Sequence, residues 1–425
     1  MNHGPGGKAG AVSGPVSYLY ALETDPGNVS VESVKASVDG SPLETVCGAG
    51  KGRISAYWAF DRLTGSGPFN SFYAAVNIDD GSGYDNGETQ LNRKAGTIAF
   101  VLDPYDLKKT VSGTKFKGKY NIMLIVPAVY WKSENNVLFL SGSPDYDAGG
   151  TVCSGMKAYA HCFGDGKTFA RVYPYIGLGV YEASVGGGRL QSVSGVLPVA
   201  GKTCDQFKAC ADNAVPAPDS RYQLWNFYQW TLYKMMAYTV MGTRNSQAVA
   251  GEGPVRGNSP SVTGLADEAG PYARSDSSRS KLFLENAWGS VSEFIGDAFL
   301  QDRALYTGNA LGGSALNGSQ TSAGVFLPPS PGRITETSSV SGTWDFPVGS
   351  VDSDRVTGLD YPGDFVYPGS GRRSLCAGGS WFGGSLAGVA CISGALGLSD
   401  ASPRTGARLS YVMSGDAAAG DRSDL

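Results

Sequence analysis

Glycine is the feature of this sequence that most constrains its fold. The chain of 425 residues contains 61 glycines and 22 prolines, while only 17% of its residues are charged. Glycine weakens helix interiors and is favoured in turns, so the sequence predicts many short strands joined by turns rather than long surface helices. Aromatic residues reach 11%, which supplies enough apolar surface to offset the chain entropy lost on folding. We therefore predict a folded, loop-rich protein dominated by β-structure.

The charge pattern and the apolar runs argue against two kinds of partner. The formal net charge is −4 and no run of lysine and arginine occurs, so no nucleic acid is expected as a partner. The longest apolar run, Ile122–Trp131, is far too short to cross a bilayer, and Met1–Gly14 lacks the apolar stretch of a signal peptide. We expect no membrane insertion and no signal-peptide export. If the protein functions outside a cell, we expect that it arrives there as part of a particle, or that a leader was removed from the chain beforehand.

Composition changes along the chain predict four parts. Short β-forming runs such as Val29–Val38 and Gly96–Leu102 alternate with Gly/Asp/Asn turns in the N-terminal part. The acidic stretch Asn77–Glu88 fails EF-hand spacing, so we predict a solvated turn there rather than a Ca²⁺ site. The expected parts are a flexible tail (1–15), a β-rich N-terminal domain (16–115), a larger domain (116–413) and a disordered acidic tail (414–425).

The larger domain is predicted to begin with a β-meander. A buried strand from Tyr120 is interrupted at Pro127, and further β-forming runs follow at Val137–Leu140 and Phe169–Tyr175.

Two helices are predicted after the meander. Thr203 and Gln206 have the spacing of a capping box, which places a helix start at Thr203. A second helix is predicted over 222–241, because an apolar stripe runs along it and Gly242 follows its end.

Cysteine usage indicates thiols rather than a disulfide framework. An odd number of cysteines is scattered along the chain without a C-x-x-C pair, which favours mostly free, buried thiols. Pairing of Cys376 with Cys391, or of Cys153 with Cys162, stays open at this point. The seven cysteines are Cys47, Cys153, Cys162, Cys204, Cys210, Cys376 and Cys391.

Histidine is too scarce for most catalytic or metal sites. The chain has only His3 and His161, which excludes a site built from several histidines. His161 precedes Cys162 and could be read as half of a nucleophile pair. Adjacent residues on a strand point to opposite faces, however, so we predict a polar strand residue instead.

Several separated motifs near the C-terminus carry a family resemblance. The motifs are Leu284-Glu-Asn-Ala-Trp-Gly-Ser-Val-Ser-Glu-Phe294, Gly378-Gly-Ser-Trp381, Ala387-Gly-Val389, Ser399-Asp-Ala-Ser402 and Gly406-Ala-Arg-Leu409. In this order they resemble the formylglycine-generating-enzyme type of the C-type lectin fold, over roughly residues 118–412. The segment Tyr173–Ser184 is similar to phage tail-associated members. The resemblance implies an α+β, loop-rich C-type lectin fold over 116–413, preceded by the small β-rich N-terminal domain.

Within this fold the motifs look most like the variable proteins of diversity-generating retroelements, whose ligand surfaces are rewritten at adenines of Asn codons. The resemblance implies a ligand-binding surface made of nine positions: Phe382, Gly383, Leu386, Ser393, Ala395, Leu396, Asp400, Ser402 and Arg404. All nine are residue types that randomised AAY codons can encode. Trp381 cannot arise that way and stands where the family keeps a scaffold residue. We expect Trp381, Trp288 and the helix over 222–241 to form the core.

Departures from the enzymes of this superfamily argue against catalysis. Leu409 stands where the oxidising members have a reactive cysteine, three histidines for iron are missing, and neither Glu-Pro-Asn nor Gln-Pro-Asp occurs for Ca²⁺-dependent sugar binding. We expect no enzyme activity, no cofactor and no bound metal. The chain is predicted to be a variable ligand- or receptor-binding protein on a virion tail or extracellular surface. Its expected partner is a protein or glycan on a target cell. A homo-oligomer is compatible with this role. The alternatives are an invariant phage tail or adhesin module and, with least support, a formylglycine-generating-type enzyme.

Overall fold

The computed structural model describes residues 18–24, 31–38, 44–46, 60–78, 95–135, 137–148, 151–163, 171–214, 220–241, 244–273, 275–308, 320–351 and 364–413. For residues 18–24, 31–38, 44–46, 146–148 and 151–152 only the backbone is described. The two predicted tails, His3, Cys47 and most of the acidic stretch Asn77–Glu88 lie outside the described residues.

The first large sheet joins strands from the two ends of the described chain. Its seven strands pair antiparallel throughout. In spatial order they are β17 (Arg221–Leu224), β30 (Arg408–Met413), β14 (Tyr175–Glu182), β7 (Tyr120–Pro127), β4 (Phe72–Asn77), β5 (Ile98–Asp103) and β6 (Asp106–Thr110). β7 is buried from Tyr120 to Val126, as its unbroken apolar run predicts for a strand covered on both faces.

The second large sheet carries the C-terminal motifs. Across the described residues its strands follow the order β23 (Thr321–Phe326), β22 (Ala304–Thr307), β21 (Ser292–Gln301), β27 (Arg372–Ala377), β28 (Ile392–Ser393), β26 (Phe365–Tyr367), β24 (Gly332–Thr337) and β25 (Pro347–Val351). A further short strand, β29 (Thr405–Gly406), pairs in parallel with β21. β26 and β28 are also parallel.

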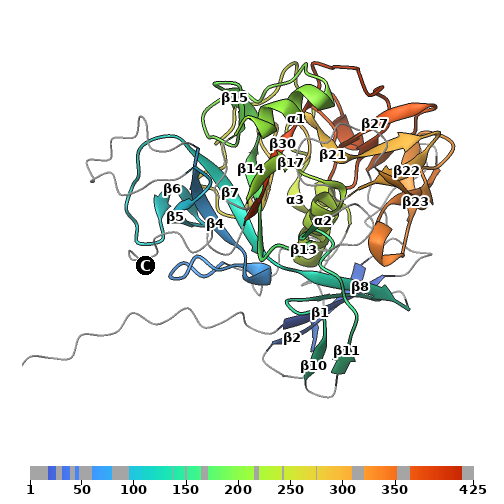
Figure 1. Cartoon of the computed structure of the whole chain (residues 1–425), viewed down its shortest axis with the longest axis horizontal. Helices are drawn as coiled ribbons and strands as arrows, with labels where there is room; N and C mark the ends of the chain where they lie inside the picture. The colour runs from blue at the N-terminus through green and yellow to red at the C-terminus, as the bar shows by residue number, and fades with distance from the viewer. Residues whose placement is uncertain are drawn as a thin grey trace, which may run out of the picture.

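A third sheet has the order β3 (Glu44–Val46), β2 (Val31–Val38), β1 (Tyr18–Thr24), β9 (Val137–Ser141) and β8 (Tyr130–Glu134). It appears with β10 in the lower part of Figure 1. Short pairings complete the strands: β10 (Tyr146–Ala148) with β11 (Thr151–Cys153), β12 (Cys162–Phe163) with β13 (Arg171–Val172), β15 (Ser184–Gly186) with β16 (Arg189–Gln191), and β18 (Tyr272–Ala273) with β19 (Lys281–Leu282) and β20 (Leu284–Glu285).

Strands on the two sides of the predicted boundary at residue 115 share sheets. β1 pairs with β9, and β4 pairs with β7. The division drawn from composition therefore does not follow the sheet topology. The predicted meander is also divided, because β7 lies in the seven-stranded sheet whereas β8 and β9 pair with each other beside β1. Pro127, which ends β7, marks the point where the chain changes sheets.

Helix α1 (Cys204–Asp212) confirms the predicted start. The Thr203 side chain accepts a hydrogen bond from the Gln206 amide, and the Gln206 side chain accepts one from the Thr203 amide. Local sequence chemistry is sufficient here because both partners lie within one turn.

Helix α2 (Phe227–Met241) begins later than predicted. Residues 221–224 form β17, which pairs with β30, so tertiary pairing overrides the apolar helical pattern at that end. The start is fixed by Asn226 and Gln229, whose side chains accept hydrogen bonds from each other's amides at 2.8 and 2.9 Å. This Asn-x-x-Gln spacing is a capping signal that marks the helix start.

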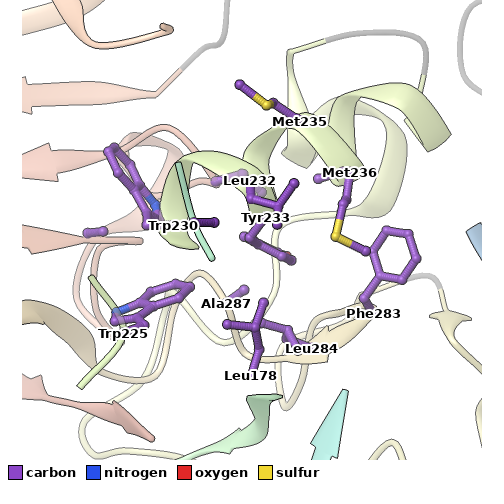
Figure 2. Packing of buried hydrophobic residues seen from close by; sticks show 14 of the residues in the cluster. Leu178, Trp225, Trp230, Leu232, Tyr233, Met235, Met236, Phe283, Leu284 and Ala287 are labelled. Atoms are coloured by element: carbon purple, nitrogen blue, oxygen red, sulfur yellow. The ribbon is translucent and has the colours of Figure 1, made fainter. Parts of the chain in front are cut away.

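All fifteen residues of α2 are buried, including those outside the predicted stripe. A helix that is buried on every side lies in the core and not at the surface. Figure 2 shows Tyr233 and Met236 facing Phe283, Leu284 and Ala287, with Trp225 and Trp230 at the other end of the cluster. Helix α2 packs against β21 and shares the main apolar cluster with residues of β14, β30 and β27. A short helix, α3 (Ser246–Ala250), follows, and single 3₁₀ turns lie at η2 (Pro68–Asn70), η3 (Ser341–Thr343) and η5 (Gly384–Leu386).

The described chain is thus a strand-rich α+β protein with abundant loops. The composition predicted its strands and loops.

The two tryptophans expected in the core differ. Trp288 is fully buried, and its indole N–H donates to the Glu252 carbonyl at 3.0 Å. Trp381 is only half-buried, so its placement in the core is wrong. The reason is that the loop bearing Trp381 leaves β27 toward the surface, where Phe382 and Arg404 cover part of the ring.

Arg408 on β30 joins elements that are far apart in the sequence. Its guanidinium donates to the Glu293 carboxylate at 2.5 and 2.9 Å. It also donates to the carbonyls of Gly179 and Val180 on β14, of Glu285 at the end of β20 and of Asn286 directly after it. Arg408 and Glu293 are both buried. One side chain therefore ties together the two motif segments 284–294 and 406–409.

We expect Trp288→Ala to lower the free energy of unfolding by about 3 to 5 kcal/mol, because it leaves a large cavity and an unpaired Glu252 carbonyl. Trp381→Ala is the matched control and should cost under about 2 kcal/mol, since its ring is partly in solvent. Urea unfolding of the two variants measures both values. Equal losses would contradict the different burial of the two rings.

We expect Arg408→Lys to lower the free energy of unfolding by about 3 kcal/mol or more. Lysine keeps the charge but cannot reproduce the planar fork, so Glu293 and several carbonyls lose buried donors. Arg256→Lys is the control, because the ion pair of Arg256 with Glu252 is on the surface, and it should leave the unfolding midpoint unchanged. A midpoint that moves equally in both proteins would show that Arg408 does not organise the core.

Candidate functional site

The nine predicted ligand-binding positions lie in residues 380–404, which we call the C-terminal loops. These loops run from the end of β27 through η5 and β28 to the start of β29. Phe382, Ala395, Asp400 and Arg404 are exposed. The remaining five, which are Gly383, Leu386, Ser393, Leu396 and Ser402, are half-buried. None of the nine residues is therefore fully buried.

The residues between these positions have the opposite environment. Residues 387–392 are buried, and Val389 and Ile392 belong to the main apolar cluster. The Val389 amide donates to the Ser246 hydroxyl at 3.1 Å, and the Ala390 amide donates to the Asp364 carboxyl at 2.6 Å. These contacts fix the middle of the C-terminal loops to α3 and to the start of β26.

Two glycines let the chain turn out of β27. Gly378 and Gly379 have φ of +85° and +76°, a region that favours glycine. A Cβ on Gly378 would lie 2.6 Å from the Ala287 carbonyl oxygen, and one on Gly379 would lie 2.8 Å from the Ala387 Cβ. The Gly-Gly of the Gly378–Trp381 motif is therefore a backbone requirement.

Phe382 and Arg404 meet at the surface although they are far apart in the loops. The Arg404 guanidinium lies 4.4 Å from the centre of the Phe382 ring and 5.4 Å from the centre of the Trp381 ring. The two rings pack edge to face with centres 6.0 Å apart. We call Trp381, Phe382 and Arg404 the surface stack.

Ser393, Ala395, Leu396 and Asp400 form a second group. Asp400 accepts from the Gly397 amide at 2.8 Å, and Leu396 packs against the cluster that contains Phe299 and Cys376. The Leu396 carbonyl accepts from the Ser374 amide and Gly397 bridges to Arg373, so this part of the group lies beside the beginning of β27. Trp381 of the surface stack follows the other end of the same strand. The nine positions therefore extend along β27.

A surface depression of about 350 Å³ adjoins the C-terminal loops. Its lining residues are Gln247, Gly251, Glu252, Gly253, Arg256, Ser275, Asp276 and Ser277. The Gln247 side chain donates to the carbonyls of Gly384 and Ala387, at 3.1 and 2.6 Å, and so joins this depression to the loops. The sequence prediction did not include these residues.

Two buried glutamates, Glu285 of the 284–294 motif and Glu182 of β14, accept hydrogen bonds from backbone amides. Glu285 accepts hydrogen bonds from the amides of Gly264 and Ala266 at 2.7 and 2.8 Å. Glu182 similarly accepts from the Val291 amide at 2.8 Å. Their carboxyl groups bind backbone amides beneath the surface and are not directed toward a ligand at the surface.

His161 is fully buried and serves the fold. Its Nε2 donates to the Val126 carbonyl at 3.1 Å, and burial lowers its pKa to about 4. Burial also raises the pKa of the neighbouring Cys162 thiol. Both shifts favour neutral groups, which is unsuitable for a thiolate–imidazolium pair.

The cysteines that the structure describes are free thiols. Cys153, Cys162, Cys204, Cys210, Cys376 and Cys391 are all outside disulfides. The two pairings left open by the sequence, Cys376 with Cys391 and Cys153 with Cys162, are therefore not made. Burial raises the pKa of Cys376 and Cys391 well above the usual thiol range.

Among the residues that the structure describes, no group of three or more His, Cys, Asp or Glu is placed to hold a metal ion. No helix in that part of the chain is both long and apolar enough to cross a membrane. No known family model matches the sequence, and no curated protein matches it either.

We expect the stability contribution of His161 to fall as the pH decreases from about 6.5 to about 4. In that range the unfolded chain binds a proton that the folded protein does not bind, so the free energy of unfolding drops by up to about 3 kcal/mol. His161→Gln keeps an N–H donor for Val126 but does not titrate. Urea unfolding at several pH values should therefore show a shallower acid-side slope in the variant. Identical slopes would contradict the low pKa.

Proposed function

We propose that this protein is a ligand- or receptor-binding protein whose C-terminal loops form a variable binding surface on a C-type-lectin-like framework of the formylglycine-generating-enzyme type. Its place would be a virion tail or an extracellular surface, and its partner a molecule on a target cell. Retroelement-directed mutagenesis would rewrite the nine positions from Phe382 to Arg404.

The observation that carries this proposal is the alternation of environments within the C-terminal loops. The nine positions all have solvent-accessible surface, while the residues at 387–392 are buried and hydrogen-bonded to Ser246 and Asp364. Surface substitutions usually change stability by no more than about 0.5 kcal/mol. Such loops can therefore change their chemistry without loss of the fold.

The framework around Arg408 supports the family resemblance. The Glu285, Asn286 and Glu293 positions of one motif meet the Arg408 of another through buried hydrogen bonds. Motifs that interact in this way serve the architecture, which leaves the loops between them available for recognition.

An oxidising activity of the formylglycine-generating type has less support. It requires a reactive thiolate, and the Cys376 and Cys391 thiols are buried with raised pKa values. Neither cysteine is at the surface of the C-terminal loops.

We expect replacement of Phe382, Ala395, Asp400 and Arg404 by Asn, singly, to change the free energy of unfolding by about 0.5 kcal/mol or less. Val389→Asn is the matched control from the same loops. It should cost about 3 kcal/mol or more, because it places an amide in an apolar cluster. Thermal and urea unfolding measure both sets, and large losses at the four exposed positions would favour an invariant structural module.

The diversification itself has a direct genetic test. The DNA near the gene should contain a near-copy of the coding region for residues 380–409 that differs at adenines, beside a gene for a reverse transcriptase. Deep sequencing of the gene from a population should find variation concentrated at the nine codons. Variation spread evenly along the gene would contradict the proposal.

A further inference from the structure

The surface stack presents an arginine that has no acidic partner among the described residues. Phe382 is 64% exposed, and the Arg404 guanidinium lies over its ring. No carboxylate of the described part of the chain lies within ion-pair distance of Arg404, whereas Arg256 nearby is paired with Glu252. A guanidinium that stacks by its face keeps its N–H edges available, and these edges match a carboxylate with two parallel hydrogen bonds.

The backbone under the surface stack is fixed before any ligand arrives. The Trp381 amide donates to the Ser290 carbonyl, and the Trp381 carbonyl accepts from the Gly257 amide, both at 2.8 Å. The Arg404 amide donates to the Ser402 hydroxyl at 3.1 Å, and its carbonyl accepts from the Ser292 amide at 2.9 Å. Such pre-organisation reduces the entropy lost on binding.

The charges around the C-terminal loops favour an acidic partner. In residues 364–413 the charged side chains outside the buried core are Arg372, Arg373, Arg404 and Asp400. Asp400 is directed at the Gly397 amide of its own loop. A further arginine, Arg333, donates to the carbonyl and hydroxyl of Ser385 at 3.0 and 3.1 Å and brings another positive charge to the loops. The chain as a whole carries a net charge of −4, whereas the charged side chains outside the core in residues 364–413 are three arginines and one aspartate.

We propose that Arg404, stacked on Phe382 and Trp381, binds the carboxylate of an Asp or Glu side chain in a protein ligand, while Phe382 packs against the apolar part of the same segment. The proposal rests on the C-terminal loops being the binding surface. An exposed aromatic ring beside an arginine is the usual composition of an energetic centre in a protein interface. Gly383 and Gly384 beside it have no side-chain donors for a hydroxyl-rich glycan. A protein segment is therefore the better match.

Selection from a random linear peptide library displayed on phage tests this proposal with the full-length protein. Peptides enriched on the unmodified protein should carry Asp or Glu at a shared position next to an apolar residue. Arg404→Gln should weaken the binding of a synthesised enriched peptide about tenfold or more. Phe382→Ala should also weaken it. Arg221→Gln, which removes an exposed arginine of β17 in the other large sheet, should leave the affinity unchanged.

Three outcomes would overturn the proposal. Enriched peptides without a shared acidic residue, affinities that Arg404→Gln leaves unchanged, or a failure to enrich any peptide would each count against it. Sialylated glycans also carry carboxylates. Binding of the protein to an array of sialylated and neutral glycans is therefore measured in parallel. Arg404-dependent binding to sialylated glycans alone would replace the protein ligand by a glycan.

The same variants separate this inference from the proposed function. If Asn at Phe382, Ala395 and Asp400 together abolishes peptide binding but Arg404→Gln does not, the loops bind ligands and only the role of Arg404 is wrong. If the peptides bind equally well to both variants, their site lies elsewhere and the proposed function itself fails. Circular dichroism of each variant shows whether it is folded.

Discussion

The buried guanidinium of Arg408 is the interaction on which the remaining architecture depends. It donates to Glu293 and to four carbonyls, two on β14 and two at the end of β20 and directly after it. A buried charge is tolerated only when it is paired and fully hydrogen-bonded. The strands of the two large sheets must therefore approach each other in one register, because a shift of either would leave Arg408 or Glu293 without a partner. This requirement holds β30 and β21 together directly after the C-terminal loops.

A second buried network fixes the other side of the core. Lys234, in the middle of α2, donates to the Asp345 carboxylate and carbonyl at 3.0 and 2.8 Å, and Tyr238 donates to the same carboxylate. Arg244 is the further cation beside Asp345. The helix is thus located by directional bonds as well as by apolar packing, which by itself would allow α2 to rotate or slide. The loops that follow β27 are consequently built on a rigid base.

This arrangement separates stability from recognition. Buried polar bonds and the apolar cluster hold the framework, whereas the C-terminal loops contribute few core contacts beyond residues 387–392. Binding surfaces on rigid scaffolds can change their side chains at little cost in stability. The surface stack illustrates the result: the rings of Trp381 and Phe382 and the guanidinium of Arg404 are held by backbone bonds to neighbouring loops, and their outward faces remain accessible.

The sequence by itself determined the features that depend on short-range chemistry. It predicted the strand-rich α+β class, the capping box of α1, the buried strand β7 and the burial of Trp288. Only the tertiary structure decided that residues 221–224 pair with β30, that strands on both sides of residue 115 share sheets, and that Trp381 lies at the surface. It also decided that Arg404 would stack on Phe382. The physical reason is that a cap or an apolar run involves residues within one or two turns of chain, whereas sheet partners and ring–guanidinium contacts join distant residues whose meeting depends on the packing of the whole core.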